Sequence, residues 1–487
     1  LHLLSRRQRQ MCIRDRYLHG VETIREKQPA SIQDATTSIN AVVVSVPTFL
    51  LKEEYQTLNR PVPIRGYSDI TKYAGKNVEG FTGYDALYTI MTESEGASIY
   101  MINVFDKDKH KSSKTVETAY LKAGKYTINE PGVTNLTVGD GVLDTDYTFE
   151  NGVITVTPEG KFKDSESVSI TYDYADVTKL AASDFIGKVD EDNIKTGLQA
   201  IYDVQALYGD EVSILTIPVY SALKAVRSAM ESVENKLKLQ SYYDCPVGTS
   251  INKAIQGRQG AADGGVDITS SSANGMLCFP YVYRYNTETD KDELRPISPA
   301  AAGMRVRLDR ERNVAKSIDN TKSFTTNGTE FPIGFGLNDP TCDSNILNSK
   351  GISTMVNHNG SYYFWGGRNA NFPTVDNIET FESVQRTASY IERSIENSSF
   401  QCVGEAITQG FIDDILNMIE SLFNKLKNPQ NQIIIDGNVK YDPSLNPAEE
   451  LAKGHIRFSY NFCPPPPVER LTYYSFIDIQ LLNSLGG

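Results

Sequence analysis

The stretch from residue 455 to residue 481 limits the fold of this chain more than any other. From His455 to Phe462 polar and apolar side chains alternate strictly, which predicts a strand with one buried face. Pro464 to Pro467 follow, and because proline has no backbone N–H and a fixed φ, they exclude ladder pairing and favour a rigid extended linker. A second alternating strand, Leu471 to Leu481, lies beyond them. It has no partner next to it in sequence, so we expect it to leave its own sheet, with pairing inside the chain as the alternative.

The first forty residues divide into two segments. Residues 1–16 carry five arginines against one acid and lack an apolar stretch long enough for a secretion signal. The string Met11–Arg16 resembles translated sequencing-adapter sequence, so we interpret residues 1–16 as a non-native segment and leave them out of the fold prediction. Residues 17–40 are polar and poor in large apolar side chains, which predicts an extended N-terminal arm. The β-branched run Ala41–Val44 follows and predicts a buried strand.

Strand and helix patterns alternate in two stretches of the chain, residues 41–104 and 180–372. This alternation is typical of an α/β core. The loop-like stretch 257–274, rich in Gly, Ser and Asp, interrupts it. The segments that carry the prediction are a helix around Tyr84–Ile90, a strand at Ile99–Val104, a strand at Val212–Ile217, a helix at Leu223–Leu237 and a strand at Met276–Tyr285.

Residues 105–179 have a different composition. They consist of short Val, Thr and Tyr-rich segments separated by Gly, Pro and Asn turns. Asn151-Gly152 lies between the segments 147–149 and 153–156, and both turn residues tolerate a positive φ, which predicts a hairpin. We therefore expect a small all-β insertion.

Two helices are predicted before the final strands. Apolar side chains recur at helical spacing from Phe381 to Ile395 and again from Phe411 to Lys427. In the second segment acidic residues stand in the first turn and lysines in the last, and Asn428-Pro429 follows. The terminal charges therefore match the helix dipole, and Asn428-Pro429 predicts where the helix ends.

Composition excludes several functional classes. The 487 residues, which suggest about three domains, carry 48 Lys and Arg against 61 Asp and Glu, a net charge of −13 that repels a phosphate backbone. The longest apolar run, Ala41–Leu51, is interrupted and shorter than the ~20 residues that a membrane span needs. The six cysteines are dispersed without a C-x-x-C pair, which favours reduced thiols in a cytosolic protein. We expect no direct nucleic-acid partner and no membrane insertion.

No motif predicts catalysis, a cofactor or a metal. A phosphate-binding P-loop, a G-x-S-x-G elbow and zinc-ligand spacing are absent from the sequence. Gly334-Phe335-Gly336 begins like a dinucleotide fingerprint, but Asp339 stands where the third glycine belongs. Asp106, Asp108 and His110 imitate a calcium loop, but Lys111 occupies the position of its glycine. We therefore predict no catalytic residues, no cofactor-binding or metal-binding residues, and no enzyme.

Several stretches resemble contractile tail sheath proteins of bacteriophages. Residues Pro296–Asp309 resemble a P-P-S-a-a-A-G-x-x-A-R-x-D segment of that family. Residues Leu347–Thr354, continued through Gly360 to Trp365–Arg368, are similar to its L-N-x-x-G-I-n-t…G…W-G-x-R-t segment. Further likeness is carried by His19–Val21, Thr36–Val44, and the closing run of the Phe411 helix, the Ile456 strand, the prolines, Glu469 and Leu471.

The resemblance implies a function and partners. A sheath subunit polymerises with itself as helically stacked hexameric rings around a tail tube protein, and contraction drives the tube through the host envelope. Its further partners are baseplate and tail terminator proteins, and it is located in the virion tail sheath after assembly in the host cytoplasm. The alternatives are the sheath of a related contractile injection system or bacteriocin and, less favoured, a tail-associated carbohydrate-binding structural protein suggested by the 27 tyrosines and the β insertion.

Together the pattern and the resemblance predict an α+β or α/β multidomain fold. It has a mixed-sheet core with flanking helices, a small all-β insertion, and N- and C-terminal arms for strand exchange. The expected divisions are residues 1–16 (adapter-derived), 17–40 (arm), 41–104 (first core segment), 105–179 (insertion), 180–372 (second core segment), 373–463 (C-terminal sheath domain) and 464–487 (proline linker and exchange strand).

Arms at both ends of the chain suit β-augmentation between neighbouring copies, in which each subunit completes a sheet in another. Contacts of this heterologous kind produce helical filaments when they do not close into a ring. The residues that we predict to take part in strand exchange are Val21, Thr23, Ile24, Leu471, Tyr473, Ile477 and Ile479.

Overall fold

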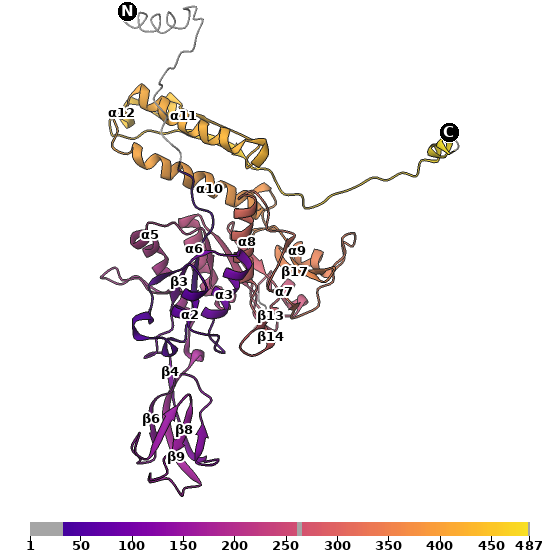
Figure 1. The fold of residues 1–487 in the computed structure, drawn as a ribbon. Coiled ribbons are helices and arrows are strands. Elements are labelled where there is room, and N and C mark those ends of the chain that lie inside the picture. The colour runs from indigo at the N-terminus through magenta and orange to yellow at the C-terminus, as the bar shows by residue number, and fades with distance from the viewer. Residues whose placement is uncertain (1–32, 261–264, 486–487) are drawn as a thin grey trace, which may run out of the picture.

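A nine-stranded mixed sheet forms the centre of the molecule (Figure 1). The structure, a computed structural model, describes residues 33–260 and 265–485. Six inner strands, from β3 to β17, run parallel, and β2, β18 and β15 are antiparallel to their neighbours. The order across the sheet is β15 (Thr321–Lys322), β18 (Ser361–Trp365), β17 (Ile352–His358), β12 (Gly275–Cys278), β11 (Gln240–Asp244), β10 (Ile214–Thr216), β1 (Ile39–Val44), β3 (Ser98–Asn103) and β2 (Pro61–Ile64).

Helices cover both faces of this sheet. In β1, Ala41 and Val43 contribute to one hydrophobic cluster and Val42 and Val44 to the other, and all four side chains are buried. A central parallel strand that is buried on both faces has an unbroken apolar sequence, which is the pattern of Ala41–Val44. The Val42 face packs against α2 (Tyr67–Ala74), α3 (Gly83–Ser94) and α8 (Ser298–Glu311), and the Ala41 face against α4 (Ala182–Ile186), α5 (Asp203–Tyr208), α6 (Lys224–Leu237), α7 (Ile251–Gly257) and α9 (Asp343–Asn348).

Helix α8 contains most of Pro296–Asp309, the stretch that resembles a segment of the sheath family. The sequence predicted no secondary structure for it. Its first backbone N–H, from Ser298, donates to Asp244 Oδ1 at 2.9 Å. A Cβ at Gly303 would lie 2.6 Å from the Cβ of Glu93, so only glycine lets α8 and α3 approach this closely. Arg307 donates to the backbone oxygen of Glu93 at 2.9 Å. The motif therefore encodes a buried central helix.

Residues 111–175 form two three-stranded antiparallel sheets at one end of the molecule, below the nine-stranded sheet in Figure 1. Buried side chains of both sheets form a separate hydrophobic cluster. The predicted hairpin is confirmed: Glu150 pairs with Val153, and Asn151 and Gly152 have φ values of 49° and 78°. The strands are β4 (Lys111–Tyr120), β9 (Ser167–Ala175) and β6 (Thr134–Val138) in one sheet, and β5 (Lys125–Thr127), β8 (Val153–Val156) and β7 (Tyr147–Glu150) in the other.

The single strand predicted at Met276–Tyr285 is wrong. The segment forms β12 in the central sheet and then β13 (Val282–Asn286) in a separate sheet with β14 (Lys291–Arg295) and β16 (Gly328–Thr329). Pro280 lies between the two strands, and because it has no backbone N–H it ends the first ladder. Because the apolar residues continue across this break, the sequence pattern predicted one strand instead of two.

The C-terminal elements form a third layer, above the sheet in Figure 1. They are α10 (Glu382–Ser399), α11 (Gln409–Leu426), β19 (Asp436–Lys440), α12 (Ala448–Leu451) and β20 (Ser459–Cys463). The apolar face predicted for α11 is confirmed, since Ile415, Ile419, Leu422 and Phe423 are buried in one cluster with β19. Among the described residues, no helix has the length and hydropathy needed to cross a bilayer.

One buried carboxyl on α6 makes the stability of the core depend on pH. Glu234 is fully buried, and burial raises its pKa to about 7 although Ser272 and Tyr243 donate hydrogen bonds to it. The folded chain therefore keeps a proton on Glu234 at pH values where the unfolded chain, with a pKa near 4.5, has released it. The contribution is complete below about pH 4.5 and is lost as the pH rises through 7.

We expect the unfolding free energy to fall by about 3 kcal/mol between pH 4.5 and pH 7 because of this group. Glu234→Gln removes the titration, so urea unfolding of the variant at pH 5 and at pH 8 should give a smaller difference than in the wild type. Equal pH differences in the two proteins would contradict the assignment.

Candidate assembly surface

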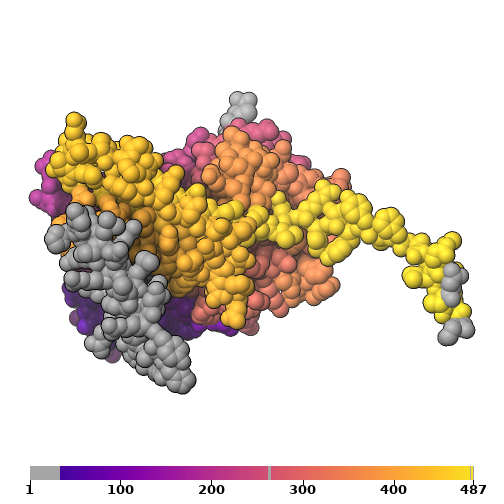
Figure 2. All heavy atoms as spheres, turned by 90° about the horizontal axis from the view of Figure 1, so that it is seen from above, coloured from indigo at the N-terminus to yellow at the C-terminus, as the bar shows by residue number. Residues whose placement is uncertain are grey.

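The C-terminal arm, residues 464–485, projects from the body of the molecule (Figures 1 and 2). Residues 464–478 have no regular secondary structure, and a 3-10 turn, Ile479–Ser484, follows. Four of the residues predicted to exchange strands lie here, and all are exposed: Leu471, Tyr473, Ile477 (98%) and Ile479. The predicted strand Leu471–Leu481 pairs with no other segment in the part of the chain that the structure describes, residues 33–260 and 265–485. Large apolar side chains exposed together are typical of a surface that a partner covers.

The sheet β19–β20 is the element that can receive such a strand. The two strands pair from Asp436↔Cys463 to Lys440↔Ser459, and among the described residues neither has a second strand beside it. One face packs on α11, where the rings of Tyr460 and Phe462 lie 6.3 and 6.4 Å from that of Phe423. A two-stranded sheet held on a helix leaves both outer edges with unpaired backbone groups, which is a template for a further strand.

The alternating strand predicted at His455–Phe462 is shorter than expected. Strand β20 begins at Ser459, although Phe458, Tyr460 and Phe462 do share the face that packs against α11. The side chain of Asn446 accepts a hydrogen bond from the backbone N–H of Arg457 at 2.7 Å and donates to its carbonyl at 2.9 Å. These bonds occupy the backbone of residue 457 and delay the start of the ladder.

The N-terminal arm can be followed only from residue 33. The predicted exchange residues Val21, Thr23 and Ile24 lie outside the described residues. Residues 33–37 follow α10 in an antiparallel sense: the backbone N–H of Gln33 donates to Ser398 Oγ at 2.9 Å, and that of Ala35 to Ser394 Oγ at 3.0 Å. Small hydroxyl side chains on one face of α10 therefore fix the start of this arm to the helix.

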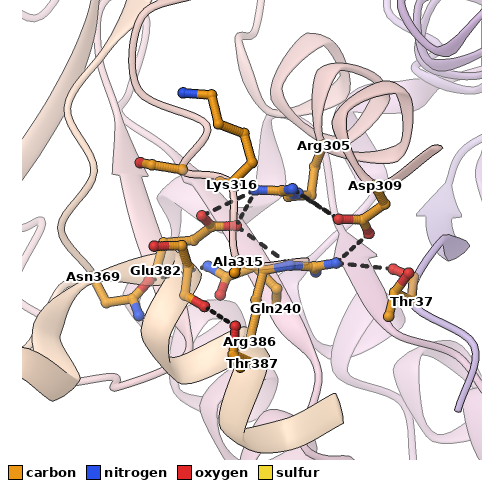
Figure 3. Close-up of polar contacts among 12 residues, drawn as sticks. Thr37, Gln240, Arg305, Asp309, Ala315, Lys316, Asn369, Glu382, Arg386 and Thr387 are labelled. Carbon is orange, nitrogen blue, oxygen red and sulfur yellow. Dashed lines mark hydrogen bonds and ion pairs between the residues drawn. The ribbon is translucent and has the colours of Figure 1, made fainter. Parts of the chain in front are cut away.

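A buried ionic network joins α10 to α8 (Figure 3). Arg305 contacts Asp309 at 2.8 Å and Glu382 at 3.3 Å, and Arg386 contacts the same two carboxylates. All four side chains are at least 94% buried. Burial alone would lower the pKa of Arg305, but Asp309 and Glu382 outweigh it and raise that pKa above its ordinary value.

The network also reaches the N-terminal arm. Arg386 donates to the backbone oxygen of Thr37 at 3.0 Å (Figure 3). Arg305 and Asp309 belong to the resembling stretch Pro296–Asp309, but Glu382 and Arg386 were not singled out from the sequence. Their opposite charges, four residues apart on the predicted helix, are the sequence feature that could have indicated them.

The start of the C-terminal arm is also fixed by an ion pair. Arg368 Nη2 lies 2.7 Å from Glu469 Oε2, and Arg368 Nε donates to Glu469 Oε1 at 3.1 Å. Arg368 is the last residue of the second stretch that resembles the sheath family, and Glu469 lies just after the prolines. Both arms are therefore attached next to α10, one along its length and the other just before its first turn.

The sequences that imitate ligand sites are ordinary turns and loops. His110 is buried, and its Nδ1 accepts a hydrogen bond from the backbone N–H of Asp106 at 3.0 Å, which closes a tight turn before β4. Gly334 and Gly336 lie in a loop without helix or strand. Within residues 33–260 and 265–485, no three His, Cys, Asp or Glu side chains are grouped so as to hold a metal ion.

Comparison with known proteins identifies the family. No family model matches the chain. The tail sheath protein of Burkholderia phage BcepMu is 34% identical over 485 residues, covering 97% of this chain and 99% of the relative. Among solved structures, the sheath complex of the extracellular contractile injection system PVC in its contracted state has a TM-score of 0.58 at 12% identity, covering 96% of this chain and 99% of that one. The contracted helical sheath of the anti-feeding prophage also has a TM-score of 0.58, at 16% identity, covering 95% and 100%.

The chain shares a mixed α/β fold with several sheets, along nearly its whole length, with these contractile sheath structures. The full-length similarity to the BcepMu protein makes the assignment specific: the chain belongs to the phage tail sheath protein family.

Proposed function

We propose that copies of this chain polymerise as stacked hexameric rings around a tail tube and that each copy is linked to its neighbours by strand exchange. In this arrangement the C-terminal arm of one copy adds to an open edge of the β19–β20 sheet of another. The observation that carries the proposal is the arm itself. Its side chains Leu471, Tyr473 and Ile477 are exposed, and they follow Glu469, which an ion pair with Arg368 attaches to the subunit body. The N-terminal residues Val21, Thr23 and Ile24 are assigned the same role at another edge.

The strand linkages allow the subunits to move without separating. We assign contraction to a change in how the bodies of the subunits pack, as rigid units, while the donated strands stay paired. The extended sheath is then a metastable state whose free energy is released without a nucleotide. The tail tube, the baseplate and the tail terminator are the expected partners, and the virion tail is the expected location, with assembly in the host cytoplasm.

We assign the insertion, residues 105–179, no part in strand exchange. The strands within it, from β4 to β9, have a hydrophobic cluster of their own and extend away from the C-terminal layer that carries both arms, which supports this assignment. Binding of a carbohydrate by this insertion remains a second prediction, which a glycan array can test with the full-length protein.

Electron microscopy tests the function directly. The purified full-length chain is expected to form hollow tubes in negative stain, whereas a variant lacking residues 17–37 is expected to remain as short or unpolymerised particles because its N-terminal strand is missing. Full-length protein that never forms tubes would contradict the sheath function. A truncated variant that polymerises as well as the full-length chain would contradict the role of the N-terminal arm alone.

A further inference from the structure

The root of the C-terminal arm is held by two points rather than one. The first is β20, whose last residue, Cys463, pairs with Asp436 of β19. The second is Glu469, which forms the bidentate ion pair with Arg368. Only residues 464–468 separate these points, and four of the five are prolines. A stiff segment fixed at both ends has a defined direction, whereas the same segment fixed at one end can swing.

Arg368 is itself held on several sides by the body of the subunit. Its guanidinium lies 3.8 Å from the ring centre of Phe381 and 4.6 Å from that of Phe372. Its Nη1 donates to Thr380 Oγ1 at 2.6 Å and lies 3.4 Å from Asp376. The side chain is only 14% exposed. Because stacking and hydrogen bonds already fix the plane of the guanidinium, the edge formed by its two remaining nitrogens, Nε and Nη2, faces Glu469.

Glu469 has no comparable support. Its side chain is 51% exposed, and the residues after it, from Arg470 onward, are exposed as well. Between residues 468 and 478, the hydrogen-bonded ion pair with Arg368 is the one that joins a side chain of the arm to the subunit body. An exposed ion pair adds little stability to a fold. Its bidentate geometry, however, specifies an orientation.

We propose that Arg368 and Glu469 form a latch that sets the direction in which the C-terminal arm leaves its own subunit, so that the arm is preorganised to reach a neighbouring copy. The proposal rests on the strand exchange proposed above. A preorganised arm loses less conformational freedom when it pairs with the receiving sheet, so the latch lowers the protein concentration at which polymerisation begins. Arg368 and Glu469 are positioning residues in this assembly and do not belong to the strand that is exchanged.

The test compares three substitutions at the latch with two controls. Glu469→Gln keeps a single hydrogen bond, Glu469→Lys places a like charge against Arg368, and Glu469→Ala removes the contact. Arg470→Gln changes the charge of the next residue on the arm, and Asp140→Asn removes the carboxylate of an exposed ion pair with Lys161 in the insertion, away from the latch. The critical concentration for polymerisation is measured by light scattering, and thermal unfolding shows that every variant is folded.

We expect Glu469→Ala and Glu469→Lys to raise the critical concentration about five- to tenfold, because an arm without the latch loses more conformational freedom when it pairs with the receiving sheet. Glu469→Gln should have a smaller effect in the same direction. Both controls should polymerise within about twofold of the wild type, and all melting temperatures should agree with the wild type.

Two outcomes overturn the proposal in different ways. If Glu469→Ala and Glu469→Lys polymerise at the wild-type concentration while deletion of residues 471–485 prevents polymerisation, the latch is wrong and strand exchange stands. If the deletion variant also polymerises normally, strand exchange itself is wrong, and the latch fails with it.

Discussion

Deletion of residues 471–485 is expected to abolish polymerisation and to leave the subunit folded. The deleted side chains whose burial the structure describes are exposed in the single chain and belong to no hydrophobic cluster of the body, so we expect their loss to leave its packing intact. In the proposed strand exchange the same apolar side chains, Leu471, Tyr473 and Ile477 among them, become buried against another copy, and each is worth about 1.5–3 kcal/mol when fully buried. Their combined loss should raise the critical concentration at least about a hundredfold.

The measurement is tube formation in negative stain over a concentration series, with the melting temperature as the check on folding. A second variant in which the order of residues 471–481 is scrambled keeps the composition and length of the arm but not its alternation. It should also fail to form tubes, because a strand presents one face only when polar and apolar residues alternate. Tubes from the deletion variant at wild-type concentration would contradict the role assigned to the arm.

Glu382→Ala is expected to lower the unfolding free energy by about 3–5 kcal/mol, because removal of one member of a buried ionic network leaves an uncompensated charge. Arg305 is fully buried and has only two carboxylate partners among the described residues, Asp309 and Glu382, so the variant leaves it with one. Arg386 loses its contact with Glu382 as well. Because this network joins α8 to α10, the loss also loosens the attachment of the C-terminal layer that carries both arms.

Glu392→Ala is the matched control for this prediction. Glu392 lies on the same helix and contacts Lys238 at 3.0 Å, but its side chain is 37% exposed. An exposed pair contributes only about 0–1 kcal/mol. Urea unfolding of both variants gives the comparison, and equal losses of stability for Glu382→Ala and Glu392→Ala would show that the buried network has no special role.

The elements that the sequence predicts best are those whose signals are local. Helix α11 begins and ends within two residues of its predicted bounds, because the amphipathic spacing, Lys425 in the last turn and the Asn428-Pro429 stop agree. The acidic first turn that the sequence predicted is wrong, since the helix begins at Gln409 and Asp413 and Asp414 follow its first turn. The Asn151-Gly152 hairpin is confirmed because two residues that accept a positive φ specify the turn.

Helix α8 was missed for a physical reason. Its residues from Ser298 to Leu308 are all buried, so no polar stripe alternates with an apolar one, and Pro299 and Gly303 lower its apparent helix propensity. The glycine at position 303 is explained by the close packing of α3 against α8, which is visible only in the folded structure.

The ionic contacts could not be predicted from local pattern. Arg305 and Glu382 are 77 residues apart in sequence, and Arg368 and Glu469 are 101 apart, so only the fold brings them together. The alternation of residues 471–481 did indicate an apolar face at the C-terminal arm, but the sheet that receives it is not a neighbour in the sequence. In the proposed strand exchange, this strand forms only in an assembly of several copies.

Helical reconstruction of tubes of the wild-type chain by cryo-electron microscopy tests strand exchange most directly, because it traces residues 464–485 in their assembled state. The expected map shows residues 471–478 as a strand hydrogen-bonded to an outer edge of β19 or β20 in an adjacent copy. A map in which the same residues turn back and pair with the β19–β20 sheet of their own chain would contradict it.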